Sequence, residues 1–196
     1  MNAHPDTYQR ILESARDLFH ASSYADVGVA AICDKANVKK GSFYHFFPSK
    51  QDLTLAVLDT YYLDFKNAIL TKAFDTGLAP MARLEKFTSL VADMQTQIFE
   101  QTGQVYGCPL GNLATELSTQ DETIRLKVEC LFNTLQGQLC ETLQAANDAG
   151  DIIISDAEAT SRAILAYFEG TMLLAKTHND PEIIRQLLPA ALQIRL

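Results

Sequence analysis

The chain has 196 residues, a formal net charge of −8, and 47% hydrophobic and 20% charged residues. This composition is typical of a soluble globular protein, and no apolar run reaches the roughly 20 residues that a membrane-spanning helix needs. The four cysteines lack the short spacing of a metal site, and the first residues lack the basic and apolar stretches of a signal peptide. The sequence therefore predicts a cytoplasmic protein with reduced thiols and no membrane segment.

The negative charge is unevenly distributed along the chain. Residues 1–50 carry six basic and five acidic side chains, whereas the rest carries ten basic and nineteen acidic ones. Residues 35–50 hold four lysines and no acid. Nucleic-acid binding depends on local neutralisation of phosphates rather than on total charge. The segment 35–50 is therefore a candidate phosphate-binding surface on an acidic body.

Apolar residues recur at helical spacing from the start of the chain. They predict a first helix over about residues 7–22, a second over 29–36 that Asp26 could cap, and a third from Lys40 to Phe47 that Pro48 ends. Phe43 and Phe47 should face inward with Ile32 and Cys33 of the second helix. Asn37 suits the tight turn between the second and third helices, because asparagine tolerates left-handed backbone.

The remainder of the chain also shows helical periodicity throughout. Ser49 can cap a fourth helix that reaches about Thr71, and five more helices follow over about 81–101, 109–117, 122–149, 156–176 and 182–194. The predicted fold is all-α with nine helices. Two domains are expected, a three-helix helix-turn-helix domain over residues 1–48 and a helical dimerisation and ligand domain over residues 49–196.

The second and third helices form a helix-turn-helix unit, whose later helix enters the major groove of DNA. Lys39 and Lys40 supply positive charge at its start, and Gly41 allows backbone to approach phosphate. Ser42, Tyr44 and His45 can reach phosphates or base edges. The DNA-binding residues predicted from this helix are Lys39, Lys40, Gly41, Ser42, Tyr44 and His45.

Residues 24–58, and above all Lys40-Gly41-Ser42-Phe43-Tyr44-His45-Phe46-Phe47-Pro48-Ser49-Lys50, resemble the TetR family of repressors. The resemblance implies that Tyr44, His45 and Lys50 contact the DNA backbone, while Lys40, Gly41 and Ser42 line the groove. It also implies a homodimer on operator DNA, formed by the last two helices. Apolar residues suited to that interface are Leu165, Phe168, Met172, Leu187 and Leu188. The chain departs from the family at Val27 and Gly28, at Asn37 and at Lys39, which puts the operator sequence in doubt.

Residues 106–116 resemble a TetR subgroup that includes sensors of electrophiles and oxidants. Cys108 precedes a helix start, where the helix dipole favours thiolate, and Lys176 could lower the thiol pKa further. Cys108 should then react before Cys33, Cys130 and Cys140, which are expected to be buried. A purely structural role for Cys108 stays open. The candidate effector or sensor residues are Cys108, Tyr61, Phe65, Tyr106, Asn112, Glu116, Phe168, Met172 and Lys176.

Other classes of protein fit less well. The sequence has no glycine-rich phosphate loop, no nucleophile elbow and no zinc signature, so no catalytic residues, metal or cofactor are expected. The expected function is a repressor that a small effector or the modification of a cysteine releases from its operator. The alternatives are reversible sensing of a hydrophobic or aromatic ligand without redox chemistry, and, further off, a helical enzyme or adaptor.

Overall fold

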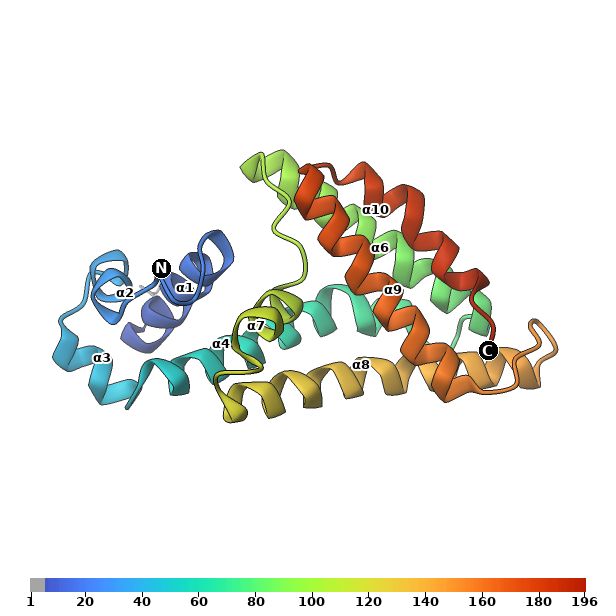
Figure 1. Ribbon diagram of the computed structural model, residues 1–196, viewed down its shortest axis with the longest axis horizontal. Coiled ribbons are helices and arrows are strands. Elements are labelled where there is room, and N and C mark those ends of the chain that lie inside the picture. The colour runs from blue at the N-terminus through green and yellow to red at the C-terminus, as the bar shows by residue number, and fades with distance from the viewer. Residues whose placement is uncertain (1–5) are drawn as a thin grey trace. The chain divides into compact units, whose positions relative to one another are not determined.

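The computed structural model describes residues 6–196, which form helices and no strands (Figure 1). Over these residues the chain forms nine helical segments, as predicted. Their bounds are α1 Thr7–Ala21, α2 Val29–Ala36, α3 Lys40–Phe46, α4 Lys50–Phe65, α6 Pro80–Thr102, α7 Pro109–Leu117, α8 Glu122–Asp148, α9 Ala157–His178 and α10 Glu182–Leu187. None of the described helices combines the length and apolarity of a membrane span. The expectation about an export signal falls largely on residues 1–5, outside the described part.

Two of these segments change their helical type along their length. α4 continues through a π-helical turn, Lys66–Leu70, into the short α5, Thr71–Ala73, and α10 continues into a 3-10 helix, Leu188–Gln193. The sequence predicted unbroken helices here. A π turn adds one residue to the helical repeat and shifts the register of the residues after it. In this register Ile69 and Leu70 are both buried.

The chain folds into two compact units. Unit 1 comprises residues up to Tyr62 together with Asn112–Val128, and unit 2 comprises Leu63–Gly111 and Glu129–Leu196. Each of α4, α7 and α8 therefore contributes residues to both units. Within unit 1, the Gln51 side chain of α4 donates to Asp121 Oδ2 at 2.7 Å, and Asp121 caps α8 by accepting from the Ile124 N–H at 3.0 Å.

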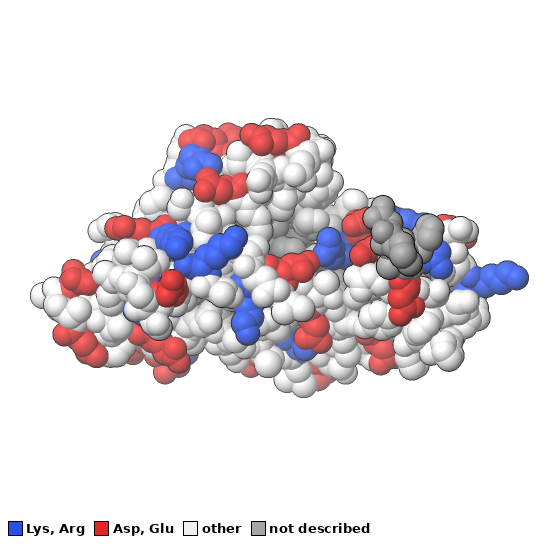
Figure 2. Space-filling view, turned by 180° about the vertical axis from the view of Figure 1, so that it is seen from behind, with Lys and Arg blue, Asp and Glu red and all other residues white. Residues whose placement is uncertain are grey.

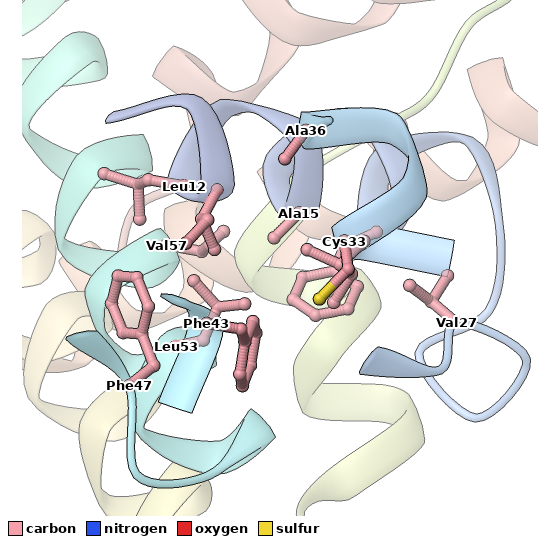
Figure 3. Packing of buried hydrophobic residues seen from close by; sticks show 12 residues of the cluster. Leu12, Ala15, Val27, Cys33, Ala36, Phe43, Phe47, Leu53 and Val57 are labelled. Carbon is pink, nitrogen blue, oxygen red and sulfur yellow. The ribbon is translucent and has the colours of Figure 1, made fainter. Parts of the chain in front are cut away.

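The core of unit 1 explains the placement of the short helix α3. Phe43 and Ile32 are fully buried, and Phe47 and Cys33 are nearly so, as predicted. Figure 3 shows Phe43, Phe47 and Cys33 in this cluster. These side chains pack with Ile11 of α1 in one hydrophobic cluster that also includes Leu53 and Val57 of α4. Burial of a Phe side chain contributes about 1.5–3 kcal/mol, so Phe43 anchors a helix of seven residues that would not be stable alone.

Local hydrogen bonds define where the helices start. Ser49 Oγ accepts the Asp52 N–H at 3.1 Å and donates to Asp52 Oδ2 at 2.6 Å, so Ser49 caps α4 as predicted. Asp26 does not cap α2, which was a wrong prediction. The N-cap position is Gly28, two residues later, and no side chain caps the helix, which begins at Val29.

In unit 2, α10 packs against both α6 and α9 (Figure 1). The ring of Phe87 on α6 lies 5.9 Å from Phe168 on α9 and 5.6 Å from Phe74. Phe168, Met172 and Leu188 are all at most 4% exposed within the protomer. The expectation that these three face a partner chain is therefore wrong, because they form the interior of unit 2 itself.

Candidate functional site

The solvent-facing side of α3 carries the side chains expected to reach DNA. Lys39, Lys40, Gly41 and His45 are exposed, Ser42 is half-buried, and Tyr44 is 53% exposed. Lys39 precedes α3 in extended backbone and makes no side-chain cap, so its ammonium is not used to begin the helix. The buried Phe43 fixes the orientation of this polar face.

The side chain of Arg10, which the sequence analysis did not identify, holds the turn before α3. Asn37 adopts left-handed backbone with φ of 52°, as predicted. The Arg10 guanidinium donates to the Ala36 carbonyl at 3.2 Å and to Thr7 Oγ1 at 3.3 Å. Arg10 thus connects α1 to the end of α2. Sequence analysis did not identify this contact, because Arg10 and Ala36 are 26 residues apart in the chain. This contact sets the position from which α3 starts.

Lys50 makes contacts inside unit 1. Its ammonium donates to the Tyr24 carbonyl and lies 3.6 Å from the centre of the Tyr24 ring, a cation–π arrangement. Burial lowers the pKa of Lys50, opposed by the Glu116 carboxylate, which raises it. The structure therefore gives Lys50 a structural contact, and its contact with the DNA backbone stays a prediction.

Glu116 joins the end of α7 to the loop between α1 and α2. Its carboxylate accepts from Ser23 Oγ at 2.5 Å and from the backbone N–H groups of Tyr24 at 2.9 Å and Ala25 at 2.8 Å. Burial would raise the pKa of Glu116, but these three bonds and the charge of Lys50 together lower it. Glu116 was predicted as an effector residue, and in the structure it holds the loop between α1 and α2.

Two further candidates for effector binding belong to unit 1. Tyr61 packs on the core that holds α3, and its hydroxyl donates to the Arg16 carbonyl at 2.8 Å. Asn112 is the first α7 residue of unit 1. Tyr61, Asn112 and Glu116 therefore belong to unit 1, and the other six candidates belong to unit 2.

The remaining candidates lie on several segments of unit 2. Phe168 and Met172 of α9 are buried, Phe65 and Tyr106 are half-buried, and Lys176 of α9 is exposed with its stem beside Gly107. Phe65 contacts Phe87 with the rings 6.3 Å apart. Among the described residues, three buried side-chain oxygens accept no hydrogen bond, and all belong to unit 2: Gln95 Oε1, Gln138 Oε1 and Glu169 Oε1.

Cys108 lies directly before α7, as predicted, but in surroundings that disfavour thiolate. Burial raises its pKa well above the usual range, and the Glu169 carboxylate raises it further. Backbone bonds from Gly111 and Leu110 at the start of α7 oppose these effects without overcoming them. The expectation that the helix start favours thiolate at Cys108 is therefore wrong, because burial and the Glu169 carboxylate outweigh the bonds from α7. An effect of Lys176 on the thiol stays a prediction. Glu169 is the residue that sequence reasoning missed.

The other thiols also differ from expectation. Cys130 is exposed and Cys140 is half-buried in the protomer, whereas Cys33 is buried. The prediction that Cys130 and Cys140 are both buried is wrong, because α8 turns Cys130 outward. The prediction that Cys108 reacts first assumed a buried Cys130, so the exposure of Cys130 removes its basis.

Acidic and basic side chains are mixed over the face that Figure 2 displays. The Lys35 ammonium pairs with the Asp17 carboxylate at 3.0 Å. Lys39 and Lys40, at the start of α3, are therefore the lysines of this segment that we expect to meet phosphate. Within residues 6–196, no three His, Cys, Asp or Glu side chains gather as a metal site would require.

A buried aromatic anchor under an exposed, lysine-led helix after a tight turn defines a helix-turn-helix regulator. Residues 11–57 match the description "Bacterial regulatory proteins, tetR family", and residues 80–188 match "Transcriptional regulator LmrA/YxaF-like, C-terminal domain". The chain belongs to the TetR family of bacterial regulatory proteins.

Similar proteins support this assignment over most of the chain. The transcriptional regulator AcuR of Cereibacter sphaeroides is 29% identical over 176 residues, which cover 89% of this chain and 78% of that protein. The repressor NemR of Escherichia coli is 28% identical over 127 residues, covering 64% and 62%. The crystal structure of a regulatory protein TetR from Rhodobacter sphaeroides superposes with a TM-score of 0.83 at 28% identity, over 97% of this chain and 99% of that one.

Proposed function

We propose that this protein is a transcriptional repressor that binds a pseudo-palindromic operator as a homodimer through α3. The observation that carries the proposal is the exposed row Lys39, Lys40, Gly41, Tyr44 and His45 on a helix fixed from below by Phe43. One helix of seven residues reads few base pairs, so a specific site needs two copies about one turn of DNA apart. Such a regulator acts in the cytoplasm, with residues 1–48 as its DNA-binding domain and 49–196 as its effector domain.

A binding assay with the DNA upstream of its own gene tests this proposal. Lys40→Ala and Tyr44→Ala should weaken binding, and each lost phosphate contact should flatten the salt dependence by about one unit of slope. Lys72→Ala is the matched control, because Lys72 is an exposed lysine of unit 2. Unchanged affinity of the double variant would contradict the assignment of α3. A wild-type protein that binds no upstream DNA would favour an adaptor instead.

We further propose that modification of Cys108 by an electrophile releases the operator. α7 starts beside Cys108 in unit 2, and its last turn carries Glu116, which holds the α1–α2 loop in unit 1. A group added to the sulfur would push against the first turn of α7. A displaced α7 would strain the bonds of Glu116 and so change the placement of the helix-turn-helix. A Cys108→Ser variant should bind operator DNA and no longer respond to the electrophile.

The second candidate is a reversible ligand without covalent chemistry. The unpartnered oxygens of Gln95, Gln138 and Glu169 favour it, because a buried acceptor without a donor costs about 1–3 kcal/mol that a bound ligand would recover. Such an effector would be an aromatic or hydrophobic molecule with hydrogen-bond donors. A normal response of Cys108→Ser to the effector would select this candidate.

A further inference from the structure

Cys108 and Glu169 form a closely fitted pair in unit 2. The two side chains share a hydrogen bond, with Cys108 just before α7 and Glu169 on α9. A methyl group at position 111 would lie 2.2 Å from Glu169 Oε2 and 3.6 Å from Cys108 Cβ. That first distance is far inside van der Waals contact, so the carboxylate occupies the space that a side chain at Gly111 would fill.

The start of α7 provides donors for a negative sulfur. The Gly111 N–H points at Cys108 Sγ with a nitrogen–sulfur distance of 3.4 Å, and the Leu110 N–H makes a second such bond. Donors aimed at the atom where charge develops stabilise a transition state more than a resting state. The two N–H groups already point at Sγ while the thiol still carries its proton.

The carboxylate of Glu169 lies in a site where charge is costly. Burial raises its pKa, and the bond from Cys108 is the one interaction that lowers it. Its Oε1 is buried and has no hydrogen-bond partner among the described residues. The stem of Lys176, also on α9, lies beside Gly107. A proton moving from sulfur to Glu169 would neutralise the carboxylate, and the negative charge would pass to the sulfur, where the N–H donors of α7 point.

We propose that Glu169 is the general base that takes the proton of the Cys108 thiol when an α,β-unsaturated carbonyl compound adds to the sulfur. The Sγ–carbon bond forms at the β-carbon while the S–H bond breaks, and the proton goes to the Glu169 carboxylate. The π electrons of the C=C bond move into the enolate, whose α-carbon then takes that proton back from Glu169. The product is a thioether, and no oxidant, reductant or leaving group is needed.

This inference rests on the proposed role of Cys108, and it accounts for a thiol that is protonated at rest. A thiolate reacts with many dissolved electrophiles, whereas a neutral thiol reacts slowly. A base that acts only on a compound already held over the sulfur makes the reaction depend on binding. The unpartnered Oε1 of Glu169 then gains a proton at the moment of reaction.

The rate of alkylation of Cys108 in Glu169→Gln tests the proposal. N-ethylmaleimide is the probe, and peptide mass spectrometry follows Cys108 with the exposed Cys130 as reference on the same molecule. Loss of a general base should slow the reaction at pH 7 by about 100-fold or more. If Glu169 merely repels the thiolate, its neutralisation would lower the thiol pKa and speed the reaction, which would overturn the proposal. Glu158→Gln on the exposed side of α9 is the control and should change nothing.

The pH profile gives a second, independent readout. In the wild type the rate should rise as Glu169 loses its proton, above its ordinary value of 4.5, and then level off. In Glu169→Gln this inflection should vanish, while an unchanged profile would contradict the proposal. A wild-type Cys108 that never reacts in the folded protein would also overturn it, and the operator assay would still report on DNA binding. Circular dichroism of the variant separates a lost base from a lost fold.

Discussion

Cys108 and Cys130 differ in the two properties that control alkylation, which are solvent access and the free energy of thiolate formation. Cys130 is exposed, whereas burial and the Glu169 carboxylate hold the pKa of Cys108 high. A general reagent such as iodoacetamide, which no site in the protein recognises, should therefore label Cys130 before Cys108. Timed quenching and peptide mass spectrometry measure the order, and the unfolded protein should show no such order. Cys108 reacting first with this reagent would contradict the burial of its sulfur.

Glu116 links pH to the stability of the loop between α1 and α2. Its folded-state pKa is lowered, so the stability it contributes is present above its ordinary value of 4.5 and is lost as pH falls through the folded-state value. Glu116→Gln should lower the melting temperature at pH 7, and the difference from the wild type should shrink below pH 4.5. Thermal unfolding followed by circular dichroism at several pH values measures this, with the exposed Glu100→Gln as control. An equal difference at every pH would show that the charge of Glu116 is unimportant.

Helix existence and several helix starts could be predicted from the sequence, because they depend on neighbouring residues. The Ser49 cap, the left-handed Asn37 and the start of α7 at Pro109 are examples. Contacts between distant residues could not be predicted. Glu169 is 61 residues from Cys108, and helical periodicity says which residues are buried together without saying which of them touch. The pKa of Cys108 was therefore predicted in the wrong direction.

The packing of α7 against α9 depends on glycine at position 111. Gly111→Ala would place a methyl group 2.2 Å from Glu169 Oε2, so the carboxylate or the helix must move. The free energy of unfolding should fall by about 1–3 kcal/mol, the usual cost of overpacking. Gly137→Ala, at a helical position on α8 with open space around it, is the matched control and should be neutral or stabilising by up to about 1 kcal/mol. Urea unfolding measures both, and equal effects of the two variants would contradict the close fit.

At the scale of the whole chain, the units do not follow the order of the sequence. Residues 112–128 join the N-terminal unit although 49 residues separate them from Tyr62. Sequence analysis expects a single domain boundary along the chain, and the domain boundary at residue 48 stays a prediction. The consequence for function is that α7 and α8 each continue from one unit into the other, so a change at Cys108 has a covalent path to Glu116 within a single helix.

α9 carries an apolar surface that the protomer does not cover. Leu173 is 64% and Leu174 47% exposed. Exposed small and neutral residues continue the same face of the helix, namely Ala166, Gly170 and Thr177. Small side chains allow a second helix to approach closely, and the adjacent leucines supply apolar area. We expect a second copy of this chain to pack here.

Leu173→Glu tests that expectation and its consequence for DNA. Two carboxylates brought together in a symmetric interface repel each other and lose hydration, so the variant should be monomeric at micromolar concentration where the wild type is a dimer. Sedimentation velocity measures the state, and Ile153→Glu is the control, because Ile153 is 90% exposed in the loop before α9. The monomer retains α3 but loses the second recognition helix one turn of DNA away, about 34–36 Å. Its operator affinity should therefore fall toward non-specific binding, typically by about 10³-fold or more. A Leu173→Glu protein that is monomeric and still binds the operator tightly would show that a single α3 suffices, and the dimeric part of the proposed function would be wrong.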